Sequence, residues 1–218
     1  MFESKYSKVL TVILVIVIIA ILGLLGFLAY DYYQKYAVTQ DTSNFVNDFE
    51  GEQDDQNVED EEIANTDENP FDDIQDAQTT SGTTKKTYKG FGVVGTMEIP
   101  KTNFKYPILE KVTKKSIETA VAFLYGTGIN QPGNSVIIGH NYRNGLFFSN
   151  NKKLNNGDKI YITDNDGKKL TYTIYNKFET TPEDTSFYQR DTGGKPEVTL
   201  STCTDDSKAR LIIFARAD

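Results

Sequence analysis

A long apolar run near the N-terminus limits what the rest of this chain can fold into. Residues 9–30 are apolar or small apart from Thr11, and this stretch of 22 residues contains no charged side chain. A helix rising about 1.5 Å per residue would span roughly 33 Å over this length, which matches the hydrocarbon core of a bilayer. The apolar part of a cleaved leader is usually only about 7–15 residues long. The run therefore predicts an uncleaved membrane-spanning helix, preceded by a short tail over residues 1–8.

The flanks of this run predict its orientation. Lys5 and Lys8 precede it, and basic residues favour the cytoplasmic side of a membrane. Three tyrosines lie within residues 30–33, and tyrosine is enriched at membrane interfaces. We expect a single-pass anchor in contact with membrane lipid through residues 9–30. The N-terminus would be cytoplasmic and the C-terminal part extracellular.

An acidic segment follows the predicted anchor. Residues 41–76 contain fifteen Asp and Glu residues and no Lys or Arg. Such a segment repels itself and has too few large apolar side chains to offset the entropy cost of ordering. We therefore expect residues 31–87 to form an extended, disordered stalk. The rest of the chain contains 23 basic and 16 acidic residues, so it is mildly basic. Such a surface could attract anionic cell-wall polymers, or it could simply keep the domain soluble.

The remaining residues, 88–218, suffice for one domain whose pattern is dominated by β-structure. Residues 116–124 are predicted to form a short helix. Many short strands with few helices favour a closed or nearly closed β-barrel. The runs that indicate strands, either apolar or alternating with period two, are residues 93–99, 106–109, 159–163 and 169–175.

Two connections between predicted strands have compositions that could indicate a binding role. Residues 164–168 read Asp-Asn-Asp-Gly-Lys and resemble part of a calcium loop, but the glutamate that such a loop requires is missing at the right spacing. A hairpin turn is therefore favoured. Residues 180–196 form a long polar connection before the last two apolar runs. Long loops beside a site often bind substrate, although a plain surface loop is the alternative.

The chain has one cysteine, Cys203, and one histidine, His140, and each ends a β-like apolar run. A thiol needs a neighbouring base or cation to act as a nucleophile near neutral pH. A lone thiol in an exported protein forms no internal disulfide and risks oxidation, which favours a functional role over an inert core position. Arg210 opens the final apolar run and is the candidate anion-binding group. These residues predict Cys–His chemistry, although each alone also fits a structural role.

The same residues resemble the signature of a known family. Residues 199–203, Thr-Leu-Ser-Thr-Cys, with Arg210 seven residues after the cysteine, resemble the Thr-Leu-X-Thr-Cys…Arg signature of sortases. Residues 139–141, Gly-His-Asn, resemble the sortase histidine motif. Residues 97–101 and 106–108 resemble the opening of the sortase barrel.

The resemblance covers residues 90–218 and implies a mostly β fold, an eight-stranded sortase-type β-barrel with short helices. It implies a cysteine transpeptidase of Gram-positive bacteria that cleaves a Leu-Pro-X-Thr-Gly-like sorting signal. A thioacyl intermediate would form on Cys203, and the threonine would then be joined to an amine. His140 would protonate the leaving amine, and Arg210 would stabilise the oxyanion. The residues implied to orient the site or contact substrate are Thr202, Ser201 and Asn141.

The implied partners are surface proteins that carry a sorting signal, and a cell-wall precursor or pilin that supplies the amine. The resemblance implies no metal or cofactor, and no aromatic–basic repeat indicates nucleic-acid binding. Residues 69–71, Asn-Pro-Phe, resemble the Asp-Pro-aromatic lid of pilus-building sortases, with Asn in place of Asp. The subclass, the sorting motif and the acceptor amine are left open.

Two other functions fit parts of the pattern. A membrane-anchored cysteine protease would use the same Cys–His pair but hydrolyse its intermediate. Papain-like enzymes, however, place the cysteine before the histidine, and here the order is reversed. A non-enzymatic, stalked wall protein would explain the anchor and acidic segment, but the chain lacks repeats and a sorting signal of its own.

Overall fold

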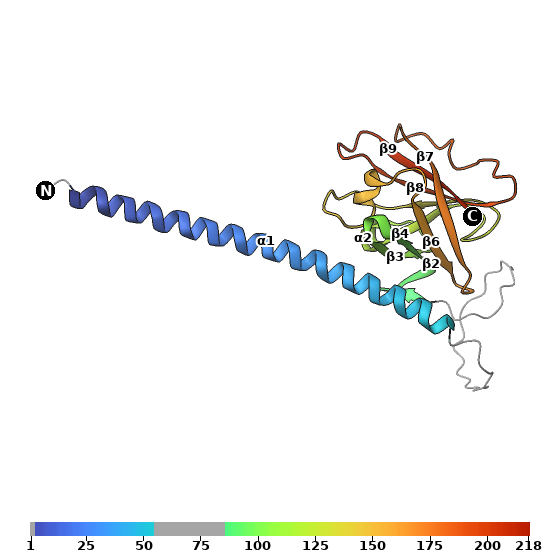
Figure 1. Ribbon diagram of the computed structural model, residues 1–218, viewed down its shortest axis with the longest axis horizontal. Helices are drawn as coiled ribbons and strands as arrows, with labels where there is room; N and C mark the ends of the chain where they lie inside the picture. The colour runs from blue at the N-terminus through green and yellow to red at the C-terminus, as the bar shows by residue number, and fades with distance from the viewer. Residues whose placement is uncertain (1–2, 55–85) are drawn as a thin grey trace, which may run out of the picture. The chain divides into compact units, whose positions relative to one another are not determined.

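The computed structural model describes residues 3–54 and 86–218, which form two compact units meeting between Asp41 and Thr42 (Figure 1). The first unit is the greater part of one long helix, and the second holds the end of that helix and a β-barrel. The elements are α1 (Glu3–Asp54), β1 (Thr87–Tyr88), β2 (Phe91–Ile99), η2 (Pro100–Thr102), β3 (Phe104–Leu109), α2 (Lys114–Thr119), β4 (Val121–Tyr125), β5 (Gly133–Ile138), η3 (Phe148–Lys153), β6 (Lys159–Asp164), β7 (Lys169–Thr180), β8 (Pro196–Cys203) and β9 (Arg210–Ala217).

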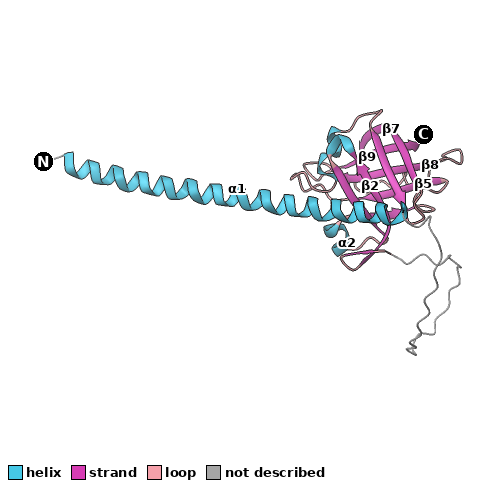
Figure 2. Ribbon diagram, turned by 60° about the horizontal axis from the view of Figure 1, so that its bottom comes forward, coloured by secondary structure: helices cyan, strands magenta, loops and turns pink. Residues whose placement is uncertain are grey.

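Eight strands close into a barrel, as Figure 2 shows, which confirms the predicted mostly β, eight-stranded fold. The strand order is β2-β3-β4-β5-β8-β9-β7-β6, and β6 pairs back onto β2 to complete the circle. The pairs β3–β4 and β5–β8 are parallel, and the other barrel pairs are antiparallel. The four predicted strand runs lie in β2, β3, β6 and β7. Fully buried aliphatic side chains from many strands fill the interior, among them Ile99, Ile108, Ile137, Ile160, Leu200 and Ile213.

The predicted helix over residues 116–124 is only partly correct. Thr113 and Ser116 form a capping box that starts α2, but the helix ends at Thr119. Residues 121–125 form β4 instead, which pairs with β3 and β5. Val121 and Ala122 are fully buried in the barrel wall, so pairing between distant strands overrides the local helical pattern.

The turn between β6 and β7 has the form expected from its composition. The Asp164 side chain accepts hydrogen bonds from the backbone N–H groups of Asp166 (3.1 Å) and Lys168 (2.9 Å). Gly167 adopts a positive φ of 79°, which glycine tolerates without strain. The Asp-Asn-Asp-Gly run therefore closes a hairpin by satisfying its own backbone.

The prediction of an extended, disordered stalk is wrong for residues 31–54, which continue α1. The charge count did not consider a buried stripe at helical spacing, in which Thr42, Val46 and Phe49 are at most 2% exposed and Phe45 is half-buried. This stripe packs against the barrel within the second unit. The rest of the predicted stalk up to residue 85, with residues 69–71, lies outside the described residues.

Aromatic and ionic contacts hold this end of α1 on the barrel. The rings of Phe45 and Tyr88 meet edge to face with centroids 5.0 Å apart. The Glu50 carboxylate accepts a hydrogen bond from Thr163 Oγ1 (2.8 Å) and pairs with Lys169 Nζ (3.0 Å). Lys105 Nζ donates to Asn47 Oδ1 at 2.7 Å. Glu50, an acidic residue of the segment predicted to be a stalk, thus contacts a hydroxyl and a basic group of the barrel.

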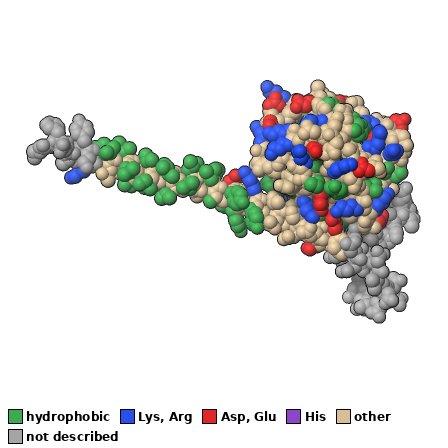
Figure 3. Space-filling view, in the orientation of Figure 1, with side chains coloured by type: hydrophobic (Ala, Val, Ile, Leu, Met, Phe, Trp, Pro, Cys, Tyr) green, Lys and Arg blue, Asp and Glu red, His purple; other side chains and the backbone are tan. Residues whose placement is uncertain are grey.

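The N-terminal part of α1 has the character of a membrane span. Within the described residues, the helical stretch Lys8–Gly51 is long and apolar enough to cross a bilayer, judged by length and composition. The large apolar side chains between Val9 and Leu28 are exposed, as the hydrophobic surface along this helix in Figure 3 shows. Exposed leucine, isoleucine and valine at this density are stable in lipid but not in water.

Candidate active site

Strand register brings the chemically distinctive residues to one end of the barrel. β5 and β8 are parallel, with Ile138 paired to Ser201, so the segments leaving these strands start side by side. His140 follows β5 and Cys203 ends β8. β9 runs antiparallel to β8 and places Arg210 directly opposite Cys203.

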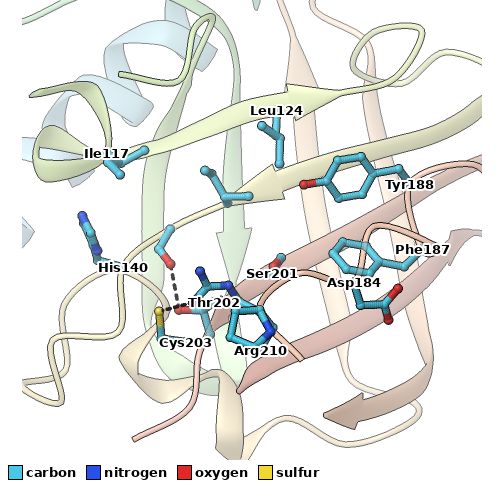
Figure 4. A pocket seen from close by; sticks show the side chains of 13 residues that line it. Ile117, Leu124, His140, Asp184, Phe187, Tyr188, Ser201, Thr202, Cys203 and Arg210 are labelled. Carbon is cyan, nitrogen blue, oxygen red and sulfur yellow. Dashed lines mark hydrogen bonds between the residues drawn. The ribbon is translucent and has the colours of Figure 1, made fainter. Parts of the chain in front are cut away.

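Arg210 contacts the only thiol of the chain. Its Nη1 donates a hydrogen bond to Cys203 Sγ at 2.6 Å (Figure 4). Both side chains are half-buried and line one cavity, so the sulfur is accessible to a ligand. The guanidinium places a permanent positive charge and several N–H donors beside the nucleophile. The same group can donate to an oxyanion formed on a carbon bound to that sulfur.

His140 lines the same cavity and is half-buried. Its ring stacks on Tyr142 with centroids 4.8 Å apart and an interplanar angle of 29°. The His140 carbonyl accepts a hydrogen bond from the Phe148 N–H at 3.0 Å, which fixes the turn after β5. The imidazole is therefore held on the wall of the cavity, where it can donate or accept a proton.

The three remaining predicted site residues join these two segments. Thr202 Oγ1 donates to the Gly139 carbonyl at 2.7 Å, linking the residue before the cysteine to the residue before the histidine. Asn141 Nδ2 donates to the Cys203 carbonyl at 3.0 Å. Ser201 is buried and contributes to the cavity wall. All six predicted residues thus meet at one place, and Thr202 and Asn141 contact backbone rather than open space.

Asp205 is a further member of the site that the sequence pattern did not reveal. It accepts hydrogen bonds from Asn141 Nδ2 at 2.9 Å and from Lys152 Nζ at 2.6 Å. The Lys152 ammonium, followed by the Asn141 amide, holds the pKa of the Asp205 carboxyl below its usual range. Asp205 lies two residues after Cys203 in the β8–β9 turn, and only the folded loop after β5 reveals its partners.

The cavity at Cys203, called here the Cys203 cavity, has a volume of about 230 Å³. Its walls are mainly apolar and come from α2, β4, β5 and the residues after it, the β7–β8 connection, the end of β8 and the start of β9. The predicted substrate loop, residues 180–196, supplies part of this wall. The lining residues are Ile117, Leu124, Ile138, Gly139, His140, Pro182, Asp184, Phe187, Tyr188, Ser201, Thr202, Cys203 and Arg210.

A buried ionic network anchors the β7–β8 connection. Glu197 on β8 has a fully buried side chain that pairs with Arg190 (2.7 Å) and Arg216 (2.6 Å). Tyr175 also donates to its carboxylate at 2.8 Å. The Arg190 guanidinium lies 3.7 Å from the centre of the Phe214 ring. A buried carboxylate between two arginines is compensated, so the network ties the end of the loop to the barrel.

This arrangement, a closed eight-stranded barrel with a cysteine–arginine pair and a histidine at one end, is that of the sortases. The sortase-domain family model matches residues 97–218, and the chain belongs to this family. Sortase A of Bacillus anthracis is 31% identical over 124 residues, covering 56% of this chain and 58% of that protein. The chain therefore aligns with less than two thirds of that relative's length.

Solved structures show the same fold. A sortase D5 transpeptidase of Clostridium perfringens has a TM-score of 0.53 and 30% identity, covering 58% of this chain and 79% of that chain. A Clostridium perfringens sortase C, solved with the C-terminal cell wall sorting motif, has a TM-score of 0.52 and 26% identity. That match covers 58% of this chain and 70% of the other. The similarity extends across different sortase classes.

Proposed function

We propose that this sortase is a membrane-anchored transpeptidase whose nucleophile is Cys203. The observation that carries the proposal is the 2.6 Å contact between Arg210 and the sulfur, in a cavity that His140 also lines. A nucleophile, a permanent cation and an imidazole on one cavity wall are the groups that acyl transfer from a peptide requires.

The reaction would proceed in two acyl transfers. The Cys203 sulfur attacks the threonine carbonyl of a sorting signal, and Arg210 donates to the resulting oxyanion. His140 gives a proton to the departing amine, and the carbon–nitrogen bond breaks to leave a thioester. The acceptor amine then loses a proton to His140 and attacks the thioester carbonyl. A new amide forms and the thiolate is released.

The apolar lining of the Cys203 cavity supports a donor with apolar residues before the scissile bond. Ile138, Leu124 and Phe187 line it and suit the Leu-Pro part of a Leu-Pro-X-Thr-Gly-like signal. The relative solved with a cell wall sorting motif supports the same class of substrate. The proposed partners are surface proteins carrying such a signal and a cell-wall precursor or pilin that presents the amine.

The long apolar helix supports attachment to the cell membrane. Sortases act on exported proteins, so the barrel would lie outside the cell and the N-terminus inside. The basic residues Lys5 and Lys8 before the apolar run agree with this orientation.

Product analysis tests the proposal. The purified protein is incubated with a panel of sorting peptides and an amine, and the products are identified by mass. A peptide fragment ending in threonine and carrying the added amine supports transpeptidation. A fragment carrying only water, whatever the amine concentration, would favour the cysteine protease. No cleavage of any signal would favour a non-enzymatic wall protein. The Cys203→Ala protein should give neither product nor a covalent adduct.

A further inference from the structure

A second cavity lies beside the Cys203 cavity, and we call it the distal cavity. It has a volume of about 750 Å³, within the range of roughly 300–1,000 Å³ that is typical of ligand sites. Leu124 and Tyr188 line both cavities, so the two lie next to each other. The distal cavity is lined by Phe123, Leu124, Tyr125, Gly126, Thr127, Gly133, Asn134, Tyr188, Gln189, Arg190 and Asp191.

Tyr188, which lines both cavities, lies at the end of the Cys203 cavity away from the nucleophile. In Figure 4, His140 and Cys203 lie toward one side and Phe187 and Tyr188 toward the other. In the proposed reaction the threonine carbonyl sits at Cys203. The residue after the scissile bond is glycine, which has no side chain to fill an apolar wall. The Leu-Pro part must therefore run toward Tyr188, and the chain before it would enter the distal cavity.

The walls of the distal cavity are preorganised. Asn134 on β5 is buried, and its Nδ2 donates to the carbonyls of Phe187 and Tyr188, both at 3.0 Å. Its Oδ1 accepts a hydrogen bond from Arg190 Nη2 at 2.9 Å. These contacts fix the loop that carries Tyr188. A side chain at Gly126 would place its Cβ 2.3 Å from the Asn134 carbonyl, so glycine is required for this close approach.

The chemistry of the distal cavity favours an apolar or aromatic side chain. The rings of Tyr125 and Tyr188 lie 5.4 Å apart with an interplanar angle of 31°, and Tyr125 is 38% exposed. Aromatic faces at this spacing offer a surface on which another ring or an aliphatic chain can pack. Arg190 pairs with Glu197 at 2.7 Å, and the acidic Asp191 also lines the cavity, so the lining does not form an anion site.

We propose that the distal cavity binds the residues immediately upstream of the sorting motif and prefers an apolar or aromatic side chain there. An extended chain advances about 3.3 Å per residue, so three residues before the leucine would span about 10 Å of this surface. The inference rests on the proposed function and adds a specificity site outside the motif itself.

The test compares two peptides with the same sorting motif. One begins at the leucine with an acetyl group, and the other carries three upstream residues that include phenylalanine. The measured quantity is the ratio of their kcat/KM values in the wild type, in Tyr125→Ala and in Tyr161→Ala. Tyr161 is a partly exposed tyrosine on β6 that lines neither cavity, and it serves as the matched control.

We expect the wild type and Tyr161→Ala to prefer the longer peptide by about three- to tenfold, as one aromatic contact provides. The ratio should fall to about one in Tyr125→Ala, or when glycine replaces the upstream phenylalanine. Equal kcat/KM values for the two peptides in the wild type would overturn the inference while leaving the proposed function standing. So would an undiminished ratio in Tyr125→Ala. Cleavage of neither peptide would instead remove the proposed function, and the inference with it.

Discussion

Arg210 Nη1 lies 2.6 Å from Cys203 Sγ because the two residues face each other across the β8–β9 pair. Both residues are therefore positioned by paired strands of the barrel wall and not by a loop. Side chains of directly opposed residues on antiparallel strands are held about 5 Å apart at Cβ, which fixes the guanidinium over the sulfur.

Replacing Arg210 with lysine should therefore reduce kcat/KM for a sorting peptide by about 100- to 1,000-fold. A point charge does not reproduce a planar group with several donors, and loss of one oxyanion donor typically has this effect. Arg216→Lys is the control, since Arg216 lies at the other end of β9 and pairs with Glu197. If Arg216→Lys were the slower variant, the wrong arginine would have been assigned.

Replacing Thr202 with valine should lower both stability and activity. The change keeps the side-chain shape but removes the donor to the Gly139 carbonyl, a loss of about 1–3 kcal/mol where the acceptor is left unpaired. Because this bond joins the segments of His140 and Cys203, kcat should fall as well. Thr202→Ser retains the hydroxyl and should recover most of the kcat. Equal kcat values for the valine and serine variants would show that this bond does not position the site.

Replacing Glu197 with glutamine should raise the KM for a sorting peptide and destabilise the barrel. Breaking a buried ion pair typically costs about 3–5 kcal/mol, because the remaining charges lose their partner. Arg190 would no longer hold the end of the β7–β8 loop that lines the Cys203 cavity. Asp218→Asn is the control, since the Asp218–Lys159 pair is exposed to solvent and screened, so its loss should change stability little. Chemical denaturation should show a large loss for Glu197→Gln only.

Removing the C-terminal end of α1 should destabilise the β-barrel. A protein starting at Thr42 keeps Val46 and Phe49 on the barrel, whereas one starting at Lys86 leaves their contact surface open. Full burial of such side chains contributes about 1.5–3 kcal/mol each. We expect a lower melting temperature for the shorter protein, measured by circular dichroism. The same melting temperature for both would mean that the helix end adds no stability.

The contacts of the Asp205 carboxylate should stabilise the fold only at pH values where this carboxyl group is ionised. Lys152 and Asn141 hold the folded pKa of Asp205 below its unfolded value of about 3.9. The contribution is therefore present above that unfolded value and is lost as the pH falls through the folded pKa. Asp205→Asn should melt below the wild type at pH 7, and the difference should shrink in strong acid. A difference that grows toward low pH would contradict this assignment.

Much of the fold follows from local patterns. Period-two alternation identified β6 and β7, and the apolar runs identified β2 and β3. β4 was missed because its five residues become a strand only through pairing with β3 and β5. The docking of residues 42–50 was missed for a related reason. A charge count takes no account of partners that are distant in sequence. Glu50 contacts Lys169 and Thr163 only when the barrel is folded.

The part of the candidate site made by residue types that are rare in this chain could be predicted from the sequence. One cysteine, one histidine and an arginine at a known spacing left few alternatives. Asp205, Arg190 and Glu197 carried no such signal, because carboxylates and arginines are common on any surface. Their roles depend on burial and on partners that are distant in sequence.

The sequence by itself determined the apolar helix, the single thiol and the β-rich character of the C-terminal part, because these depend on composition and short-range periodicity. Only the tertiary structure decided that His140 and Cys203 share a cavity. The parallel pairing of β5 and β8 brings their ends together. Gly139 and Thr202, which are 63 residues apart in the sequence, form a hydrogen bond there. Such pairing is set by how all eight strands close and bury their apolar faces at once, which no local pattern encodes.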